Sequence, residues 1–312
     1  DCDPGYDDAL AILLAARHFD VLGVTAVAGN VDVERTTLNA RRVVDLTGLP
    51  IPVARGCARP LAQDPIHVPE IHGRSGLDGY EFPPPRARLD GRHAVEFLID
   101  TARARDGVTL IATGPLTNVA EALRRAPDLA RCIREISLMG GSVTLGNMTP
   151  AAEFNIWFDP EAADAVFRSG IPLWMCGLNL TRQATVDVPM IEGIGALGTR
   201  TGKAIAALLR SYLAGVQRST GAVAAAIHDP CAVAILLEPA VISWVPMHVV
   251  VECRGEHTRG MTVCDARHVP AFNPTVAAGG LPRGLPANAR VAVALDAPGF
   301  ARLLSDALAS FP

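Results

Sequence analysis

Four aspartates stand within the first eight residues of the chain, at Asp1, Asp3, Asp7 and Asp8, with a Pro-Gly pair between the second and the third. The Pro-Gly pair predicts a tight loop, and the apolar residues from Ala9 onward predict a helix after it. Carboxylates crowded into one loop repel one another, which raises their pKa values unless a cation neutralises them. Ca²⁺ and Mg²⁺ prefer such oxygen ligands. The stretch therefore predicts a metal site, although either Asp7 or Asp8 alone could simply cap the helix.

Other polar residues come just after apolar runs that are typical of buried strands. Asn30 follows the run 21–27, Thr113 follows the run 108–112, and Gly140-Gly141 and then Asn147 follow the run 133–139. In a sheet of parallel strands, ligands bind beyond the carboxyl ends of the strands. We therefore expect these positions and the aspartate loop to meet at one shared site.

A later loop is polar as well and carries Asn147, Glu153 and Asn155. Their paired donors and acceptors suit the neighbouring hydroxyl groups of a sugar. A plain surface loop before a helix is the alternative interpretation. We adopt that alternative for Asp159, because an aspartate followed by Pro160 is typical of a helix start.

His228 and Asp229 precede Pro230, and two interpretations stay open. Pro230 suits the first position of a helix, so Asp229 could be its cap and His228 a buried histidine. Alternatively, the pair joins a titratable acid and base to a ligand for a hard metal ion. His72 lies in a long loop over residues 56–92, and a loop of this length predicts a lid that closes over a ligand.

The bulk composition limits the class of protein. Of the 312 residues 49% are apolar, so the chain can bury a large core, and a net charge of −4 without a Lys/Arg-rich run argues against nucleic acid as a partner. No apolar run approaches membrane-spanning length. Seven scattered cysteines without a Cys-x-x-Cys pair argue against zinc and suit the reducing cytoplasm. The chain starts at Asp1 without Met, and we expect a first strand to lead into this residue.

Apolar strands alternate with helical patterns along the chain. This alternation predicts one α/β domain, residues 1–312, with a mainly parallel open sheet flanked by helices and with helical and hairpin additions in the C-terminal half. The expected strands are residues 21–27, 51–53, 108–112, 133–139, 171–176, 241–251, 258–263 and 291–295. The expected helices are residues 8–19, 33–46, 93–105, 118–125, 160–168 and 298–308, with further helix between 177 and 220.

Taken together, these residues resemble the inosine-uridine-preferring nucleoside hydrolases. The most specific match is the stretch Asp-Cys-Asp-Pro-Gly-Tyr-Asp-Asp-Ala at residues 1–9. Further matches follow in the same order over most of the chain, at Gly29-Asn30, His72-Gly73, Gly76-Leu77, Thr113 to Asn118, Met139-Gly140-Gly141, Glu153-Phe154-Asn155 and His228-Asp229-Pro230. The resemblance implies a Rossmann-like fold and a Ca²⁺-dependent N-ribohydrolase, which splits a ribonucleoside with water into ribose and a free base. It also implies a homodimer or a homotetramer.

The resemblance assigns a role to each site residue. The implied ligands of Ca²⁺ are Asp3, Asp8, Asp229 and the backbone carbonyl of Thr113. The implied ribose-binding residues are Asp7, Asn30, Asn147, Glu153 and Asn155, and the remaining substrate-binding residues are His72, Met139, Phe154 and Tyr212. Asp3 is the expected general base on the attacking water, and His228 resembles the acid that assists departure of the base.

The preferred base, purine or pyrimidine, stays open. Some members of the family carry two tyrosines near the base, whereas here Tyr212 is present and Val216 stands one turn later. The purine-specific branch has no histidine at the position of His228. Retention of His228 therefore favours the broader or pyrimidine-accepting branch.

Two other classes of protein compete with a nucleoside hydrolase. One is a non-catalytic, Ca²⁺-dependent protein that binds ribose or nucleosides. The other is a metal-dependent phosphatase with an Asp-x-Asp nucleophile, and the lack of a strong phosphate-binding lysine argues against it.

Overall fold

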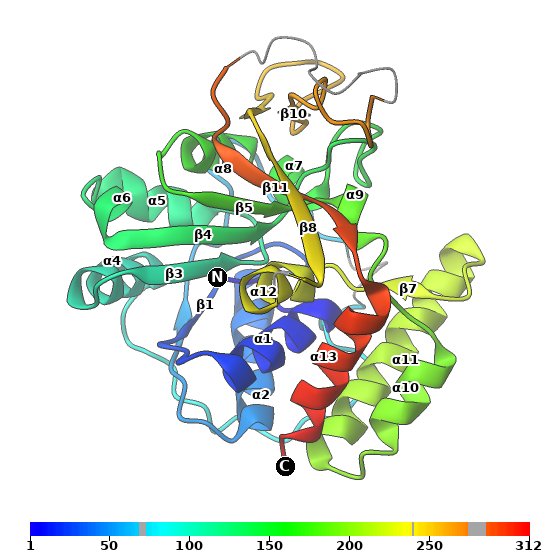
Figure 1. Ribbon diagram of the computed structural model, residues 1–312. Helices are drawn as coiled ribbons and strands as arrows, with labels where there is room; N and C mark the ends of the chain where they lie inside the picture. The colour runs from blue at the N-terminus through cyan, green and yellow to red at the C-terminus, as the bar shows by residue number, and fades with distance from the viewer. Residues whose placement is uncertain (69–72, 239, 274–284) are drawn as a thin grey trace.

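The centre of the molecule is a five-stranded sheet, seen in the computed structural model, which describes residues 1–68, 73–238, 240–273 and 285–312 (Figure 1). The strand order is β3 (Val108–Ala112), β4 (Ile133–Met139), β5 (Leu173–Cys176), β11 (Ala289–Leu295) and β8 (Ile242–Met247). The first four strands run parallel, and β8 pairs antiparallel with β11 at the edge. The expected α/β fold with a mainly parallel sheet is therefore confirmed.

Residues 1 and 2 connect this sheet to a smaller parallel pair, β1 (Val24–Ala26) and β2 (Val53–Arg55). On one side the Cys2 amide donates to the Thr25 carbonyl at 2.9 Å, and on the other the Thr113 amide donates to the Asp1 carbonyl at 2.8 Å. The chain at residues 1–2 thus runs between β1 and β3 as part of the sheet. Asp3 consequently leaves the sheet at the carboxyl ends of its central strands.

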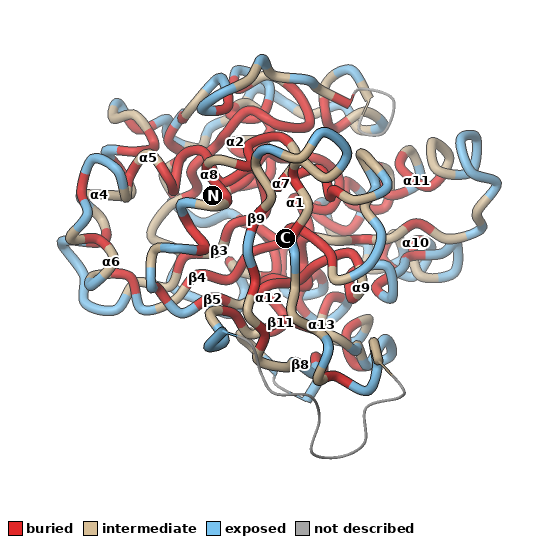
Figure 2. The backbone as a smooth tube through the Cα atoms, turned by 90° about the horizontal axis from the view of Figure 1, so that it is seen from above, coloured by how far each residue is buried: buried red, intermediate tan, exposed pale blue. Residues whose placement is uncertain are grey.

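Helices cover both faces of the sheet. One apolar core unites α1 (Tyr6–His18), α2 (Val33–Thr47), α11 (Arg200–Thr220), α12 (Pro230–Leu237) and α13 (Ala297–Ala309). A second core unites α5 (Thr117–Arg125) and α8 (Pro160–Phe167) with the other face. Figure 2 shows that α1 and α12 run through the buried interior, which places the start of each helix deep in the molecule. Within the described residues, no helix is both long and apolar enough to cross a membrane.

Shorter elements complete the fold. The helices among them are α4 (Ala94–Ala104), α6 (Leu129–Cys132), α7 (Phe154–Phe158), α9 (Leu178–Thr181) and α10 (Val188–Gly195). The strands are β6 (Thr185–Val186), β7 (Ala225–Ala226), β9 (Val249–Val251) and β10 (Thr262–Cys264). Antiparallel pairing joins β6 to β7 and β9 to β10. Among these elements, α9, α10 and the pairs β6–β7 and β9–β10 are the expected helical and hairpin additions in the C-terminal half.

Most predicted elements are confirmed, but several boundaries were wrong. The strand expected over residues 21–27 is the shorter β1, and the strand expected over residues 258–263 is β10, which begins later. The first helix begins at Tyr6 rather than at residue 8, so Asp7 and Asp8 belong to its first turn. The strand expected over residues 241–251 is two strands, β8 and β9, which pair with different partners. A continuous apolar run does not reveal that its two halves join different sheets.

Candidate active site

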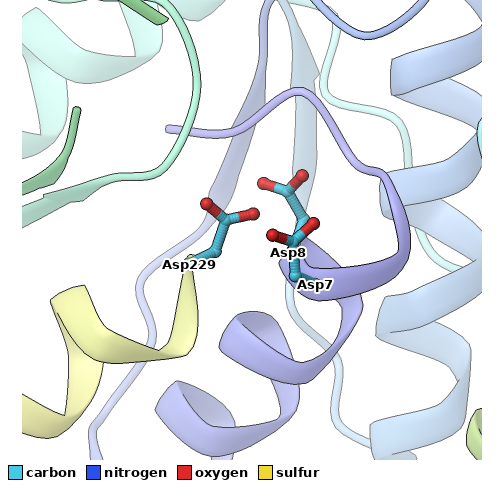
Figure 3. A group of neighbouring side chains, drawn as sticks. All are labelled: Asp7, Asp8 and Asp229. Carbon is cyan, nitrogen blue, oxygen red and sulfur yellow. The ribbon is translucent and has the colours of Figure 1, made fainter. Parts of the chain in front are cut away.

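Three buried carboxylates converge where α1 and α12 begin. Asp7 and Asp8 project from the first turn of α1, and Asp229 stands directly before α12 (Figure 3). One carboxylate oxygen of each residue lies within 4.8 Å of the others. Asp8 and Asp229 are close enough to share a hydrogen bond. Together with the adjacent Asp3, we call these residues the carboxylate cluster.

Asp8 has two tasks. Its Oδ2 accepts the Gly5 amide at 2.9 Å, so it caps α1, and its Oδ1 accepts the Thr113 hydroxyl at 2.7 Å. Asp229 does not cap its helix in this way, because its backbone is already helical and its side chain accepts no amide of α12. The helix-cap interpretation therefore holds for Asp8 and is wrong for Asp229, whose carboxylate is left for the cluster.

Asp3 is held against the loop after β1. Its Oδ2 accepts the Asn30 amide at 2.7 Å, and the Asn30 side chain donates to the Asp3 carbonyl at 3.0 Å. Glycine permits this approach: a Cβ on Gly29 would overlap the Asp3 carboxylate, and one on Gly114 would lie 2.7 Å from Oδ1. Asp1 behaves differently, because its carboxylate accepts hydrogen bonds from Thr25 and Asn118 instead of joining the cluster.

The carboxylate cluster concentrates negative charge where water cannot screen it. Burial, together with the charge of neighbouring carboxylates, raises the pKa of Asp8 to about 6 and the pKa values of Asp3 and Asp229 well above their usual range. A cation among these oxygens would remove the repulsion. The convergent atoms of Asp7, Asp8 and Asp229 are hard carboxylate oxygens, which fit Ca²⁺ or Mg²⁺ better than a softer metal ion. The acidic cluster can therefore hold a metal ion.

A wall of amide and carboxylate groups adjoins the cluster. The Asn155 side chain donates to the carbonyls of Thr113 at 2.8 Å and Met139 at 3.0 Å. Glu153 accepts the amides of Gly141 and Asn155, each at 2.9 Å, and burial raises its pKa to about 7. Both side chains are buried, so the wall is rigid and brings together β3, β4 and α7.

The other predicted substrate residues lie in more varied places. Asn147 is exposed, and its Oδ1 accepts the Phe154 amide at 2.9 Å. Phe154 is buried and its ring lies 5.8 Å from that of Phe158. His72 lies outside the described residues. Beyond it, Asn39 donates to the Ser75 carbonyl at 2.7 Å and Leu77 is buried in the core, so this part of the loop is anchored.

His228 and Tyr212 also lie close to the cluster. The His228 amide donates to Asp7 Oδ2 at 3.1 Å, and its Nδ1 lies 2.7 Å from the hydroxyl of Thr181. Burial lowers the pKa of His228. The Tyr212 hydroxyl donates to the Ala226 carbonyl at 2.8 Å, and its ring stacks on Tyr6 at 5.3 Å. We call these four side chains, His228, Thr181, Tyr212 and Tyr6, the histidine side.

Sequence reasoning missed Thr181 and Tyr6. A signal for Thr181 was available, because it follows the strand 171–176 as Asn30 and Thr113 follow theirs. Tyr6 stands between the aspartates, but its stacking on Tyr212 depends on how α11 packs over α1, which no local pattern reveals.

A cavity lies elsewhere in the described structure. It measures about 460 Å³ and is lined mainly by apolar residues of α1, α4, β1 and β3, such as Ile12, Phe97 and Leu110. Asp7, Asp8 and Asp229 are not part of its wall. A mainly apolar cavity offers few groups for polar chemistry, so the convergent carboxylates identify the site better than cavity size does.

Comparison with known proteins gives a consistent result. The sequence profile described as inosine-uridine preferring nucleoside hydrolase matches residues 1–302. The pyrimidine-specific ribonucleoside hydrolase RihA of Shewanella sp. strain ANA-3 is 42% identical over 316 residues, covering 100% of this chain and 95% of that protein. RihA of Escherichia coli O1:K1 is 42% identical over 313 residues, covering 99% of this chain and 96% of that protein.

Solved structures agree with the sequence relatives. The purine-preferring ribonucleoside hydrolase from Gardnerella vaginalis has a TM-score of 0.87 at 32% identity, covering 98% of this chain and 96% of its own. The plant nucleoside hydrolase PpNRh1 has a TM-score of 0.87 at 30% identity, covering 99% of this chain and 97% of its own. The chain therefore belongs to the inosine-uridine preferring nucleoside hydrolase family and is a ribonucleoside hydrolase, an enzyme that acts on N-glycosyl compounds.

Proposed function

We propose that this protein hydrolyses the N-glycosidic bond of ribonucleosides in a Ca²⁺-dependent reaction. The observation that carries the proposal is the buried carboxylate cluster, whose charge needs a cation and whose oxygens suit Ca²⁺. Asp3, Asp8, Asp229 and the Thr113 carbonyl would hold the ion. When bound, Ca²⁺ would supply Lewis-acid chemistry to a water molecule and to sugar hydroxyls.

The chain's own residues would divide the remaining work. Asp7, Asn30, Asn147, Glu153 and Asn155 would bind the ribose hydroxyls, and Met139, Phe154 and Tyr212 would line the pocket. Positive charge develops on the ribose ring as the bond breaks, and the neighbouring carboxylates would stabilise it.

The reaction needs one base and one acid. The bond from C1′ to the nucleobase nitrogen breaks, and its electron pair leaves with the base. The water oxygen bonds to C1′, and Asp3 takes the proton that the water loses. His228 gives the departing base a proton, which it recovers from solvent. The hydrogen bond from its amide to Asp7 supports this role, because it holds His228 beside the cluster.

Pyrimidine ribonucleosides such as uridine are the substrates that we propose. The support is the 42% identity to proteins named pyrimidine-specific and the presence of His228. The neighbour named purine-preferring is less similar, at 32% identity.

Ribose release from uridine, cytidine, inosine, adenosine and uridine monophosphate tests the function. We expect ribose from the nucleosides, with the pyrimidines fastest, and little reaction with the nucleotide. Binding of all four nucleosides without ribose release would support a non-catalytic binder instead. Phosphate release from the nucleotide, with no ribose from any nucleoside, would support the phosphatase.

A further inference from the structure

The hydroxyl of Thr181 is placed to control the ring of His228. Thr181 Oγ1 lies 2.7 Å from His228 Nδ1, and Thr181 is fully buried. Among the described residues, that hydroxyl has no other hydrogen-bond partner, so it is committed to the imidazole. The His228 amide is tied to Asp7 at 3.1 Å. Backbone and ring are therefore held at two separate points.

A hydroxyl is a special partner for an imidazole because it can donate or accept. It donates to Nδ1 of a neutral ring, whose proton then sits on Nε2, and it accepts from Nδ1–H of a charged ring. The hydroxyl therefore keeps its contact with Nδ1 in the charged ring and in both neutral tautomers. A backbone carbonyl at the same place could only accept, so it would bind Nδ1 only while that nitrogen carries a proton.

The opposite edge of the ring is free to meet a ligand. His228 is only half-buried, although its Nδ1 contacts the fully buried Thr181. Within the part of the chain that the structure describes, Nε2 has no hydrogen-bond partner. The free nitrogen therefore belongs to the more accessible edge of the ring.

Thr181 sits on a well-anchored segment. The Leu178 amide donates to the Gly141 carbonyl at 2.9 Å. The side chain of Asn179 accepts the Val143 amide at 3.2 Å and donates to the Ala292 carbonyl at 2.8 Å. Because this backbone is held at several points, the Thr181 side chain can fix the angle of the imidazole ring instead of moving with the ring.

We propose that Thr181 is a positioning residue that fixes the angle of the His228 ring and directs its Nε2 edge at the departing base. The inference rests on the proposed role of His228 as the group that assists the leaving base. Thr181 itself touches neither substrate nor water in this scheme. It acts only through the imidazole.

The test compares two leaving groups in three variants. Uridine has a poor leaving group that needs the His228 proton, whereas nitrophenyl riboside releases a stable anion that does not. We expect Thr181→Val to lower kcat/KM for uridine about 10–100-fold, because an unpaired buried partner costs about 1–3 kcal/mol. For nitrophenyl riboside, the same variant should keep kcat/KM within about threefold of the parent value. This substrate does not need the His228 proton, so it should feel only the small effect of losing a remote hydrogen bond. Thr181→Ser, which retains the hydroxyl, should resemble the parent on both substrates.

Two measurements distinguish a failure of this inference from a failure of the proposed role of His228. If His228→Ala loses equal factors on both substrates, the proposed role of His228 is wrong and the inference falls with it. If His228→Ala is selective but Thr181→Val matches the parent, or loses equal factors on both, only the inference is overturned. Thr201→Val is the matched control, since Thr201 is also buried, with its hydroxyl 2.9 Å from the Leu46 carbonyl. It should show no leaving-group selectivity.

Discussion

The carboxylate cluster and the histidine side are built in different ways. Asp3 and Asp8 each accept a backbone amide, from Asn30 and Gly5, so their carboxylates follow the course of the chain itself. On the histidine side, two contacts join one side chain to another, between His228 and Thr181 and between Tyr212 and Tyr6. A site fixed by backbone tolerates little change, whereas one made of side-chain pairs can change by single substitutions. Under the proposed function, the difference would suit constant chemistry at ribose and variable recognition of the base.

The largest effect should come from the sugar. If the carboxylate cluster and its metal ion bind the 2′-hydroxyl, 2′-deoxyuridine leaves buried polar groups unpaired, and discrimination should reach ~10⁴-fold in kcat/KM. The measurement compares uridine with 2′-deoxyuridine, and inosine with 2′-deoxyinosine. Both pairs should give similar ratios, because the sugar is read independently of the base. Comparable turnover of the ribo and deoxy substrates would show that the cluster does not read this hydroxyl.

Asp8→Ala should remove both the metal ion and turnover. Loss of a ligand from a hard-metal site removes much of the electrostatic stabilisation of the transition state, so kcat/KM should fall about 10³-fold or more. Calorimetric Ca²⁺ titration and ribose release should report the same loss. Asp187→Ala is the control, because Asp187 only caps α10 by accepting the Met190 amide at 3.0 Å. That variant should lose about 1 kcal/mol of stability and keep its metal ion.

Gly29→Ala tests whether the backbone around Asp3 is as intolerant as the structure indicates. The added Cβ would overlap the Asp3 carboxylate, so we expect about 1–3 kcal/mol lower free energy of unfolding. Displacement of Asp3 should also cost about 10–100-fold in kcat/KM. Gly193→Ala in α10 is the control, since its Cβ meets open space. Parent-like activity of Gly29→Ala on uridine would show that the placement of Asp3 is not critical.

Val216→Tyr should have the smallest effect and should act on base preference alone. Val216 lies on α11 one turn beyond Tyr212 and is only half-buried. A second aromatic ring near the base should favour the larger purine, raising kcat/KM for inosine relative to uridine about tenfold, the worth of one aromatic contact. Gln217→Tyr, at an exposed neighbouring position, should leave the ratio unchanged. An unchanged ratio in Val216→Tyr would place this turn of α11 away from the base.

The two regions also differ in how far the sequence predicts them. The strands β3 and β4 and the helix α2 with its Asp32 cap follow from local patterns, and the rule on carboxyl ends of strands correctly gathers Asn30, Thr113 and the aspartate loop. Local patterns do not reveal that the Asp1 carboxylate stays outside the carboxylate cluster, because its hydrogen-bond partners come from distant strands and helices. The stacking of Tyr6 on Tyr212 is equally hidden, since it depends on helix packing.

The most direct test of the central claim is ribose release from uridine before chelation, after exhaustive chelation, and after Ca²⁺ is added back. We expect activity to disappear on chelation and to return as about one Ca²⁺ binds per chain, because the carboxylate cluster offers one group of convergent oxygens. Full activity in the chelated enzyme, with metal content verified to be zero, would contradict the account.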